Sequence, residues 1–429
     1  MLVILRRIKC ALLELYTMNN DKQISDSINI FTLSNGMRCV HRRTQDPVMY
    51  CGIVIDAGSR DEQDKPGLAH FVEHTLFKGT LKRNSWRIAN RMETVGGELN
   101  AYTSKEETVL YSCAPAANTQ RGLELLGDIV ARSTFPANEL ENEKRVVIEE
   151  INSYLDSPCD SVYDEFEDLI YAGSALGHNI LGTEQSVRAL TSADCRAFID
   201  TFYVPQRMVA YCASPDSPAS AERWMERYFG GLHHPAPDYH RTAPPEPKRF
   251  DSIRNDNGYQ AHTVMGSRIF GRRDPRRFSL FLLNNILGGP CMNSRLNREI
   301  RDKNGYAYSV DSSVALMSDC GLITVYFGAE QSHVKECKKI VVRELSRLAD
   351  STMNARSFET ARRQYIGQLT VSSEQRESRV MNLAKSLLYF GSIHDMQWTA
   401  DRIAELRAED VRSMAEMILS SGLSSLTLC

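Results

Sequence analysis

The sequence lacks a hydrophobic run that approaches the roughly 18 apolar residues needed to cross a bilayer, so no membrane span is expected. It also lacks a basic run with interleaved aromatic residues, and its formal net charge is only −3. Nucleic-acid binding is therefore not expected, because no positive field would gather phosphates. A hydrophobic content of 42% and a charged content of 24% instead indicate a globular protein.

Cysteines are present but do not form recognisable pairs. The 11 cysteines are scattered along the chain, and no two of them form a Cys-x-x-Cys motif. This number and spacing favour free thiols in a reducing compartment over a disulfide framework or a cysteine zinc site.

The segment 1–27 lacks the features of a secretory signal. Arg6, Arg7 and Lys9 follow the first apolar residues instead of preceding them, and no small-residue cleavage site ends the segment. We interpret residues 1–27 as an N-terminal extension. Two alternatives stay open: an organelle presequence, or translation that starts at Met18.

The length of the chain, 429 residues, predicts two or more domains. The polar, proline-rich stretch 233–250 is predicted to be a linker, since proline disfavours helices and central strands. It separates residues 28–232 from residues 251–429. In both parts, helix-period segments alternate with β-rich ones such as 107–114 and 322–329. Each part is therefore predicted to be an α+β domain with a mostly antiparallel sheet covered by helices.

The two halves resemble diverged repeats of one unit. In each, two helix-period segments are followed by a polar stretch and a similar ending, Asp-Leu-Ile-Tyr-Ala-Gly or Ser-Leu-Leu-Tyr-Phe-Gly. The matched segments are 121–133, 141–151 and 168–173 in the first half, and 335–350, 358–369 and 386–391 in the second.

A His-x-x-Glu-His motif lies in a predicted helix within residues 64–80. Asp64 is expected to cap this helix, with Pro66 in its first turn and Gly79 at its C-terminal end. His70 and His74 are four residues apart, so about 40° separates them on one helix face, and both can bind one metal ion. Imidazole nitrogens suit zinc.

Glu73 lies on the same side of this helix. A carboxylate there can take a proton from a metal-activated water as the water attacks a peptide carbonyl. The order is the inverse of the commoner His-Glu-x-x-His motif. The competing interpretation is a pair of surface histidines on a helix.

A third ligand is expected from the predicted helix 140–155, because a catalytic zinc site has three protein ligands and one open position. Glu143 and Glu150 are seven residues apart and border its apolar stripe. A carboxylate beside a buried stripe is costly unless it is paired or metal-bound. From the residues alone, the alternative that both extend to the rim stays open.

At these residues the sequence resembles the pitrilysin-type (M16) zinc metallopeptidases. The resemblance is strongest to the short two-domain members, namely the β-subunits of mitochondrial processing peptidases and their bacterial homologues. The matching segments are GLAHFVEHTLFKGT (67–80), GGELNAYTSKEETVLYS (96–112), EKRVVIEEI (143–151), HNILGTEQSVRALT (178–191) and SRLNREIRDKNGYAYSV (294–310).

The resemblance implies one Zn²⁺ per chain, held by His70, His74 and Glu150. It implies that Glu73 is the general base and that Glu143 orients the site through another residue. The alternative for Glu143 is a surface ion pair.

The resemblance also implies four substrate-binding residues. Asn100, Ala101 and Tyr102 match a segment of an edge strand to which a substrate backbone adds as a further strand. Phe77 matches an aromatic residue that lines the pocket after the scissile bond. The alternatives are an ordinary hairpin edge for the three residues and plain core packing for Phe77.

In the second half, Arg301 and Tyr308 match a family pair spaced by seven residues. The resemblance implies that Arg301 grips the substrate backbone and that Tyr308 hydrogen-bonds the oxyanion. The alternative is an arginine at a helix end and a tyrosine in a strand. If the halves are aligned on Gly79 and Gly289, no metal ligand or base recurs, so the second half is expected to bind no metal. The aligned pairs are His70 with Leu280, Glu73 with Leu283, His74 with Asn284, and Glu150 with Gln368.

The resemblance implies a zinc-dependent endopeptidase that hydrolyses short unfolded peptides or leader and targeting peptides. The chain would supply half of a clam-shaped chamber, and a homodimer would complete it, with Arg301 and Tyr308 acting in trans on the partner's zinc site. The alternatives are a processing-peptidase-like subunit that needs an inactive partner, or a non-catalytic scaffold subunit. The bacterial cytoplasm is the expected location, with the mitochondrial matrix as the alternative.

Overall fold

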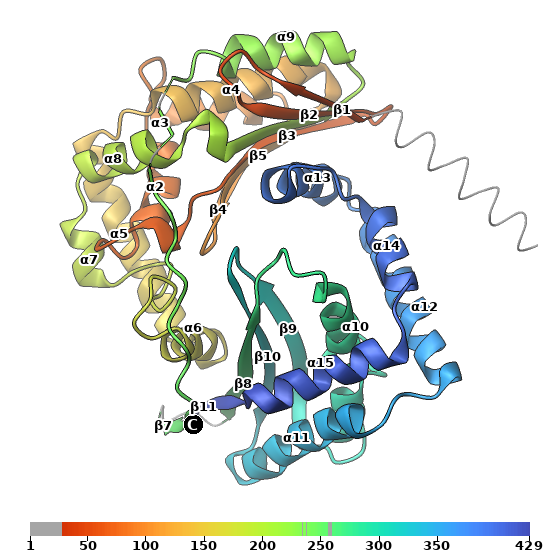
Figure 1. Cartoon of the computed structure of the whole chain (residues 1–429). Helices are drawn as coiled ribbons and strands as arrows, with labels where there is room; N and C mark the ends of the chain where they lie inside the picture. Colours follow the sequence, from red (N-terminus) through yellow and green to blue (C-terminus); the bar gives the residue numbers. More distant parts are fainter. Residues whose placement is uncertain (1–27, 234, 237, 256–259) are drawn as a thin grey trace, which may run out of the picture.

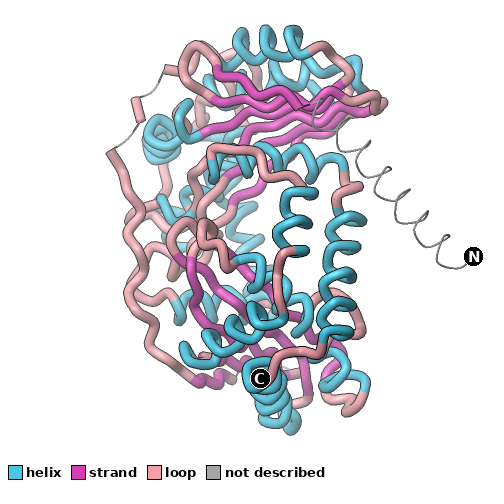
Figure 2. Tube along the Cα trace, turned by 45° about the vertical axis from the view of Figure 1, so that its right-hand side comes forward, coloured by secondary structure: helices cyan, strands magenta, loops and turns pink. Residues whose placement is uncertain are grey.

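The computed structural model describes residues 28–233, 235–236, 238–255 and 260–429. These residues form two sheets, one in each half of the sequence, with helices packed on both (Figure 1). Figure 2 shows the two groups of strands, separate from one another, from a second direction. Across the described residues, every helix falls short of the length and apolar character that a membrane span requires.

The first sheet has six strands and is antiparallel except where β2 lies beside β6. β3 reads Val-Met-Tyr-Cys-Gly-Ile-Val-Ile, and this almost continuous apolar run is typical of a strand covered on both faces. β4 lies at one edge and pairs only with β5 among the described strands. In spatial order the strands are β1 (Ile28–Thr32), β2 (Arg38–Arg43), β6 (Met208–Ser214), β3 (Val48–Ile55), β5 (Thr108–Pro115) and β4 (Glu98–Thr103).

The second sheet has five strands and is antiparallel except where β7 lies beside β11. β10 is buried along its whole length, and β9 forms the free edge beside it. In spatial order the strands are β7 (Asp251–Arg254), β11 (Ser424–Leu428), β8 (Ala261–Phe270), β10 (Cys320–Ala329) and β9 (Ala307–Leu316). The predicted fold class, α+β with mostly antiparallel sheets covered by helices, is confirmed.

Each sheet carries helices of its own half on one face. α4 illustrates why: Leu123, Leu126 and Ile129 recur at helical spacing and are fully buried in the core of the first half. The helices of the first half are α2 (Leu68–Leu76), α3 (Ser85–Glu93), α4 (Thr119–Arg132), α5 (Ala137–Leu155), α6 (Pro158–Ile170), α7 (Glu184–Ala189), α8 (Ser192–Phe202) and α9 (Pro218–Phe229). Those of the second half are α10 (Arg277–Gly288), α11 (Val334–Asp350), α12 (Ala355–Ser372), α13 (Arg376–Phe390), α14 (Met396–Ala404) and α15 (Ala408–Ser421).

Five short helical turns complete the described elements. They are η1 (Ser59–Asp61), η2 (Ala116–Asn118), η3 (Pro205–Arg207), η5 (Gln331–His333) and the π-helical η4 (Asn297–Asp302).

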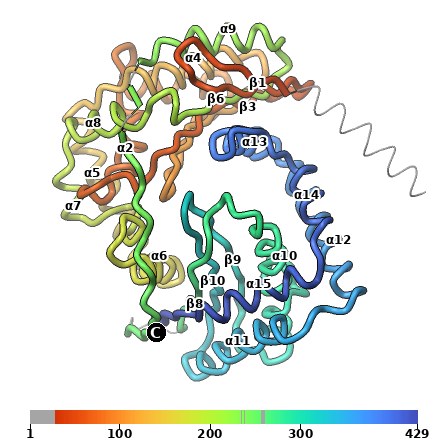
Figure 3. The backbone as a smooth tube through the Cα atoms, in the orientation of Figure 1, coloured from red at the N-terminus to blue at the C-terminus, as the bar shows by residue number. Residues whose placement is uncertain are grey.

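The opposite face of each sheet is covered by a helix from the other half. α13 packs Val380, Ala384 and Leu387 onto the first sheet, and α6 packs Val162 and Phe166 onto the second. Figure 3 shows blue α13 beneath the strands of the first sheet and yellow α6 beside those of the second. The similar endings 168–173 and 386–391 therefore belong to two equivalent helices, each exchanged between the halves.

A buried charge network joins the halves beside these helices. The guanidinium of Arg60 donates to Glu106 at 2.6 Å and to both carboxylate oxygens of Asp319 at 2.7 Å. Glu106 also accepts the backbone N–H of Ser318 at 2.8 Å. Arg60 and Glu106 are almost fully buried. Removing one partner of such a pair destabilises the folded state, because it leaves the other charge buried without a partner. We call Arg60, Glu106, Ser318 and Asp319 the junction network.

Candidate metal centre

His70 and His74 lie on α2, whose other residues anchor the helix. Phe71, Val72 and Leu76 are fully buried in the core of the first half, which fixes the direction of the opposite face. That face carries both imidazoles, with ring centroids 4.5 Å apart.

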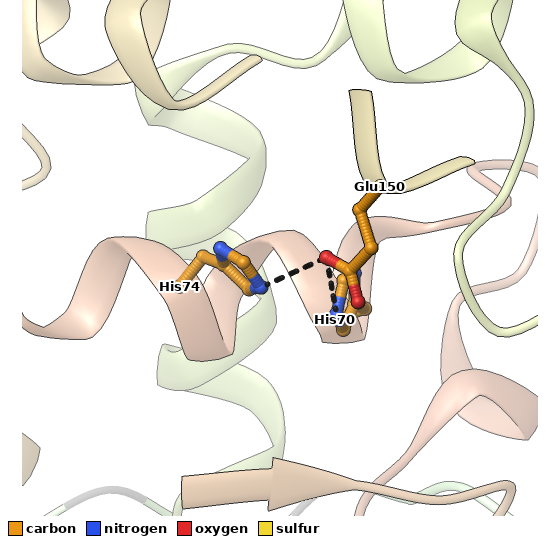
Figure 4. A group of neighbouring side chains, drawn as sticks. All are labelled: His70, His74 and Glu150. Atoms are coloured by element: carbon orange, nitrogen blue, oxygen red, sulfur yellow. Dashed lines mark ion pairs between the residues drawn. The ribbon is translucent and has the colours of Figure 1, made fainter. Parts of the chain in front are cut away.

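Glu150 reaches these imidazoles from α5. Its Oε2 lies 3.7 Å from Nε2 of His70 and 3.5 Å from Nε2 of His74 (Figure 4). The three ligand atoms lie within 4.8 Å of one another, close enough for one metal ion. α5 is held in place by Leu140, Val147 and Ile151, which are buried as the predicted apolar stripe requires. The predicted ligands therefore meet although Glu150 follows His74 by 76 residues and His70 by 80 residues in the sequence.

Glu143, two helical turns before Glu150, contacts the other nitrogen of His74. Its Oε1 lies 2.9 Å from Nδ1 of His74, and its Oε2 accepts from Nζ of Lys78 at 2.6 Å. Burial alone would raise the pKa of Glu143, but these two hydrogen bonds outweigh it and lower that pKa. An anionic Glu143 keeps the proton of His74 on Nδ1 and leaves Nε2 free to bind a metal. Glu143 is therefore a buried partner of His74 and not a surface ion pair, and its role in orienting the site stays a prediction.

The two histidines differ in their surroundings. Burial, and then the neighbouring His74, lowers the pKa of His70 to about 3, so His70 is neutral and in the form that binds metals. Burial also opposes protonation of His74, but the hydrogen bond to Glu143 and the nearby carboxylates outweigh it and raise the pKa of His74. The carboxylates that favour the protonated form of His74 would also favour a metal ion beside its ring.

Glu73 lies between the histidines on α2 and faces the end of β4. Its Oε2 accepts a hydrogen bond from the Thr103 hydroxyl at 2.8 Å. Burial raises the pKa of Glu73, which brings its proton affinity closer to that of a general base at neutral pH. Thr103 directly follows the predicted segment Asn100–Tyr102, so the alternation of that strand could have indicated its contact with Glu73.

The start of α2 differs from the prediction. The N-cap position is Gly67, with φ of 90°, and no side chain caps it, so the expected cap by Asp64 is wrong. The buried carboxylate of Glu62 accepts the backbone N–H groups of Gly67 at 2.8 Å and Ala69 at 2.9 Å, and it contacts Nε2 of His178 at 3.1 Å. The helix ends before Phe77, so Gly79 does not end it. The sequence spacing located the helix, but it did not predict that Glu62, from the preceding turn, would accept the first N–H groups of the helix.

The predicted substrate segment lies on β4, the edge strand. Ala101 packs toward the core that holds α2, whereas Tyr102 packs on the opposite face, where its hydroxyl donates to Glu107 at 3.3 Å beneath α13. Phe77 packs partly against the core and, with Asn100, lines a pocket of about 330 Å³. The backbone edge of β4 therefore lies beside Glu73 with no partner strand among the described residues.

Arg301 of η4 and Tyr308 at the start of β9 lie next to each other. The guanidinium carbon of Arg301 is 5.4 Å from the centroid of the Tyr308 ring, and the tyrosine is 80% exposed. The hairpin that ends β9 touches the first half at Ser318, through Glu106. Tyr308 lies about ten residues from that contact, or about 30 Å of strand. Among the described residues, neither Arg301 nor Tyr308 contacts His70, His74 or Glu150, and the action of the pair on a zinc site stays a prediction.

The second half shows no second metal site among the described residues, because the only candidate group is His70, His74 and Glu150. Leu280 and Leu283 are fully buried on α10. The alignment pairs His74 with Asn284 and Glu150 with Gln368. In the structure Gln368 instead accepts a hydrogen bond from the amide of Asn285, at 2.6 Å.

Comparison with known proteins agrees with this geometry. Residues 38–184 match the family described as insulinase (peptidase family M16), and residues 189–365 match the peptidase M16 inactive domain. An uncharacterized zinc protease of Streptomyces coelicolor is 33% identical over 86% of this chain and 82% of its own length. The uncharacterized zinc protease YmxG of Bacillus subtilis is 30% identical over 92% of this chain and 96% of its own length.

Solved structures share the fold at lower sequence identity. A peptidase M16 inactive domain from Pseudomonas fluorescens aligns with a TM-score of 0.87 at 20% identity, covering 94% of this chain and 98% of that one. A protease from Helicobacter pylori aligns with a TM-score of 0.85 at 20% identity, covering 94% and 99%. The site and the fold define a two-sheet metallopeptidase architecture. The chain belongs to the M16 family of peptidases.

Proposed function

We propose that this protein is a zinc-dependent endopeptidase, with His70, His74 and Glu150 as the ligands of one Zn²⁺ and Glu73 as the general base. The observation that carries the proposal is the convergence of the three ligand atoms within 4.8 Å beside the half-buried carboxylate of Glu73. Two imidazoles and one carboxylate are the donor set of a catalytic zinc site with an open position. Zinc bound there supplies Lewis acidity, which lowers the pKa of water and polarises a carbonyl.

The residues of the chain divide the remaining work. Glu73 takes a proton from the attacking water and returns it to the leaving amine, for which its raised pKa is suited. Thr103 holds the Glu73 carboxylate in place through its hydroxyl, at 2.8 Å. Glu143 fixes the ring orientation and the tautomer of His74.

The substrate class we propose is short unfolded peptides, including leader or targeting peptides. The edge of β4 offers unpaired backbone groups next to Glu73, and a peptide that binds there must be extended. Hydrogen bonds between the main chains of β4 and the peptide would depend little on the sequence of the peptide. The pocket of about 330 Å³ beside Phe77 and Asn100 would receive one side chain of that peptide.

We also propose that two copies of the chain complete each other's sites. Tyr308 is 80% exposed, and the guanidinium carbon of Arg301 lies 5.4 Å from the centroid of its ring. About 30 Å of strand separates Tyr308 from the hairpin after β9, which touches the first half at Glu106. In a symmetric homodimer the two residues would reach the partner's zinc site, where Arg301 binds substrate backbone and Tyr308 donates to the oxyanion.

The activity is tested with Glu73→Gln and a quenched peptide. We expect this variant to keep one zinc per chain but to lose about 10²- to 10⁴-fold in turnover, because only the proton transfer is removed. Glu150→Gln should lose zinc as well as activity. The matched control is Glu149→Gln, an exposed neighbour on α5. Full hydrolysis by the wild type after exhaustive chelation would exclude the proposed mechanism.

A further inference from the structure

A second cavity lies away from the zinc site, between the first sheet and the C-terminal helices. It measures about 530 Å³, within the usual range for small-ligand sites. Ile28 and Arg42 of β1 and β2 form one wall, and the last turn of α12, one face of α13 and the first turns of α14 form the others. We call it the α12–α14 pocket.

Two arginines on one side of this pocket have no acidic partner. Arg42 comes from β2 and Arg379 from α13, and among the described residues neither forms an ion pair or a side-chain hydrogen bond. The Nε of Arg42 is buried without a hydrogen-bond acceptor. The two guanidinium groups repel one another: burial, followed by the positive charge of Arg379, lowers the pKa of Arg42.

The acidic residues around the arginines are already engaged. Asp46 pairs with Arg376 at 3.2 Å. Asp395 accepts the backbone N–H of Trp398 at 2.8 Å, and Asp401 accepts from the side chain of Gln397 at 2.8 Å. Glu374 is the remaining acid whose charge acts on Arg42. An anion in the pocket would therefore meet two unpaired guanidinium groups and displace no ion pair.

The pocket also has an apolar and aromatic part. The rings of His394 and Trp398 stack with centroids 3.8 Å apart and planes 8° apart, and Phe278 supports Trp398 from behind at 5.5 Å. Leu369, Leu383 and Met396 extend this part. A ligand that fits must combine one anionic end with an apolar or aromatic body.

We propose that the α12–α14 pocket binds a carboxylate that carries an apolar or aromatic body, with Arg42 and Arg379 gripping the carboxylate and Trp398 packing on the body. A planar carboxylate matches the guanidinium fork. Asp395 and Asp401 also line the pocket, which favours a singly charged carboxylate over a doubly charged phosphate. This site does not depend on the proposed peptidase activity.

The test is a calorimetric titration with N-acetylphenylalanine and with its amide, which differ only in the carboxylate. We expect one saturable site for the acid and binding of the amide that is weaker by about tenfold or more, as for the loss of a charge-assisted hydrogen bond. Arg42→Gln and Arg379→Gln should each weaken binding of the acid by about tenfold. Arg43→Gln is the matched control, an exposed arginine beside Arg42 that does not line the pocket.

Thermal unfolding of each variant verifies that it is folded. The proposal is overturned if wild type shows no saturable binding, if acid and amide bind equally, or if both pocket variants match Arg43→Gln. Inorganic phosphate that binds more tightly than N-acetylphenylalanine would also overturn it. A phenylalanine-terminated peptide with a free carboxylate, titrated into Glu73→Gln, separates two sources of the ligand. Tighter binding of the peptide identifies peptide C-termini, and binding of only the small acid identifies a free carboxylate.

Discussion

At the scale of single residues, the position of a carboxylate decides its chemistry. Glu143 and Glu150 lie on the same helix, yet Glu150 faces Nε2 of both histidines whereas Glu143 faces Nδ1 of His74. Lys78, four residues after His74 on the chain, pairs with Glu143 and keeps it anionic. The same helix thus brings one carboxylate to the nitrogens that could hold a metal ion and the other to the opposite nitrogen of His74.

Removing the charge of Glu143 tests this division. In Glu143→Gln, we expect zinc affinity to fall by about 10- to 100-fold, because His74 loses the partner that sets its tautomer. The measurement is competition with a chromophoric chelator, and Glu149→Gln serves as the control. A Glu143→Gln variant with unchanged zinc affinity and unchanged activity would show that Glu143 has no role in orienting the site.

A second buried carboxylate, Asp128 of α4, governs stability instead of chemistry. It is fully buried and accepts from Thr80 at 2.8 Å, from Arg132 at 2.7 Å and from Arg83. Burial opposes ionisation, but these partners outweigh it and lower the pKa of Asp128. A lowered pKa stabilises the folded state at pH values above the usual carboxyl range of about 4, and the stabilisation is lost as pH falls below it.

We therefore expect Asp128→Asn to lower the free energy of unfolding by about 3 kcal/mol at pH 7, since one partner of a buried ion network is removed. At pH 3 the difference from wild type should be smaller, because the Asp128 carboxylate of the unfolded chain takes up a proton below its usual pKa of about 4, which favours unfolding of the wild type. Urea unfolding at both pH values measures this, with exposed Asp200→Asn as the control. A difference that stays constant with pH would mean that Asp128 acts through packing alone.

At the scale of elements, α6 and α13 join the two halves of the molecule. Each leaves its own half and covers the open face of the other sheet. Neither sheet can therefore bury both of its faces without the other half. The same exchange places Tyr102 of the edge strand against Met381 of α13, so the proposed substrate strand is supported by the second half.

Truncation of a buried side chain on α6 measures this coupling. Phe166 is fully buried and packs over the second sheet beside Gly266. We expect Phe166→Ala to destabilise the protein by about 3–5 kcal/mol and to leave a single cooperative transition. Urea unfolding followed by both tryptophan fluorescence and circular dichroism is the measurement. Val371→Ala, on an exposed position of α12, should have little effect.

Loss of stability in only one of two separate transitions would contradict this prediction. It would mean that the halves fold independently and that α6 is dispensable for the second sheet.

At the scale of the whole molecule, the junction network holds the two halves of one chain in a fixed relation. Arg60 and Glu106 are buried where the hairpin of β9 and β10 meets the first half, next to the turn that follows β4. This fixed relation is the background against which we propose that a second copy completes the chamber.

A mixing experiment tests the proposed action in trans. Glu73→Gln and Tyr308→Phe should each be nearly inactive alone, but a refolded equimolar mixture should recover about a quarter of wild-type activity. Half of the dimers then contain both variants, and one of their two sites combines an intact Glu73 with an intact Tyr308. The control is a mixture of two variants that both lack the same residue, because no dimer in it can form an intact site. A mixture no more active than either variant alone would exclude completion in trans.

The sequence by itself determined the elements and the chemistry of the motif. Apolar periodicity located α4, α5, β5 and β10, and the spacing of His70 and His74 placed both on one helix face, because these patterns depend only on local geometry. Comparison of the two halves of the sequence also matched the endings 168–173 and 386–391, which the structure places at the ends of α6 and α13. None of these inferences needs the distance between residues that lie far apart in the chain.

Only the tertiary structure decided which groups meet. It assigned Glu150 to the histidines and Glu143 to Nδ1 of His74, replaced the expected cap Asp64 by Glu62, and revealed the exchange of α6 and α13. The junction network was likewise absent from every local pattern. The physical reason is that periodicity tells which face of an element is buried, whereas the packing angles between elements determine what that face touches.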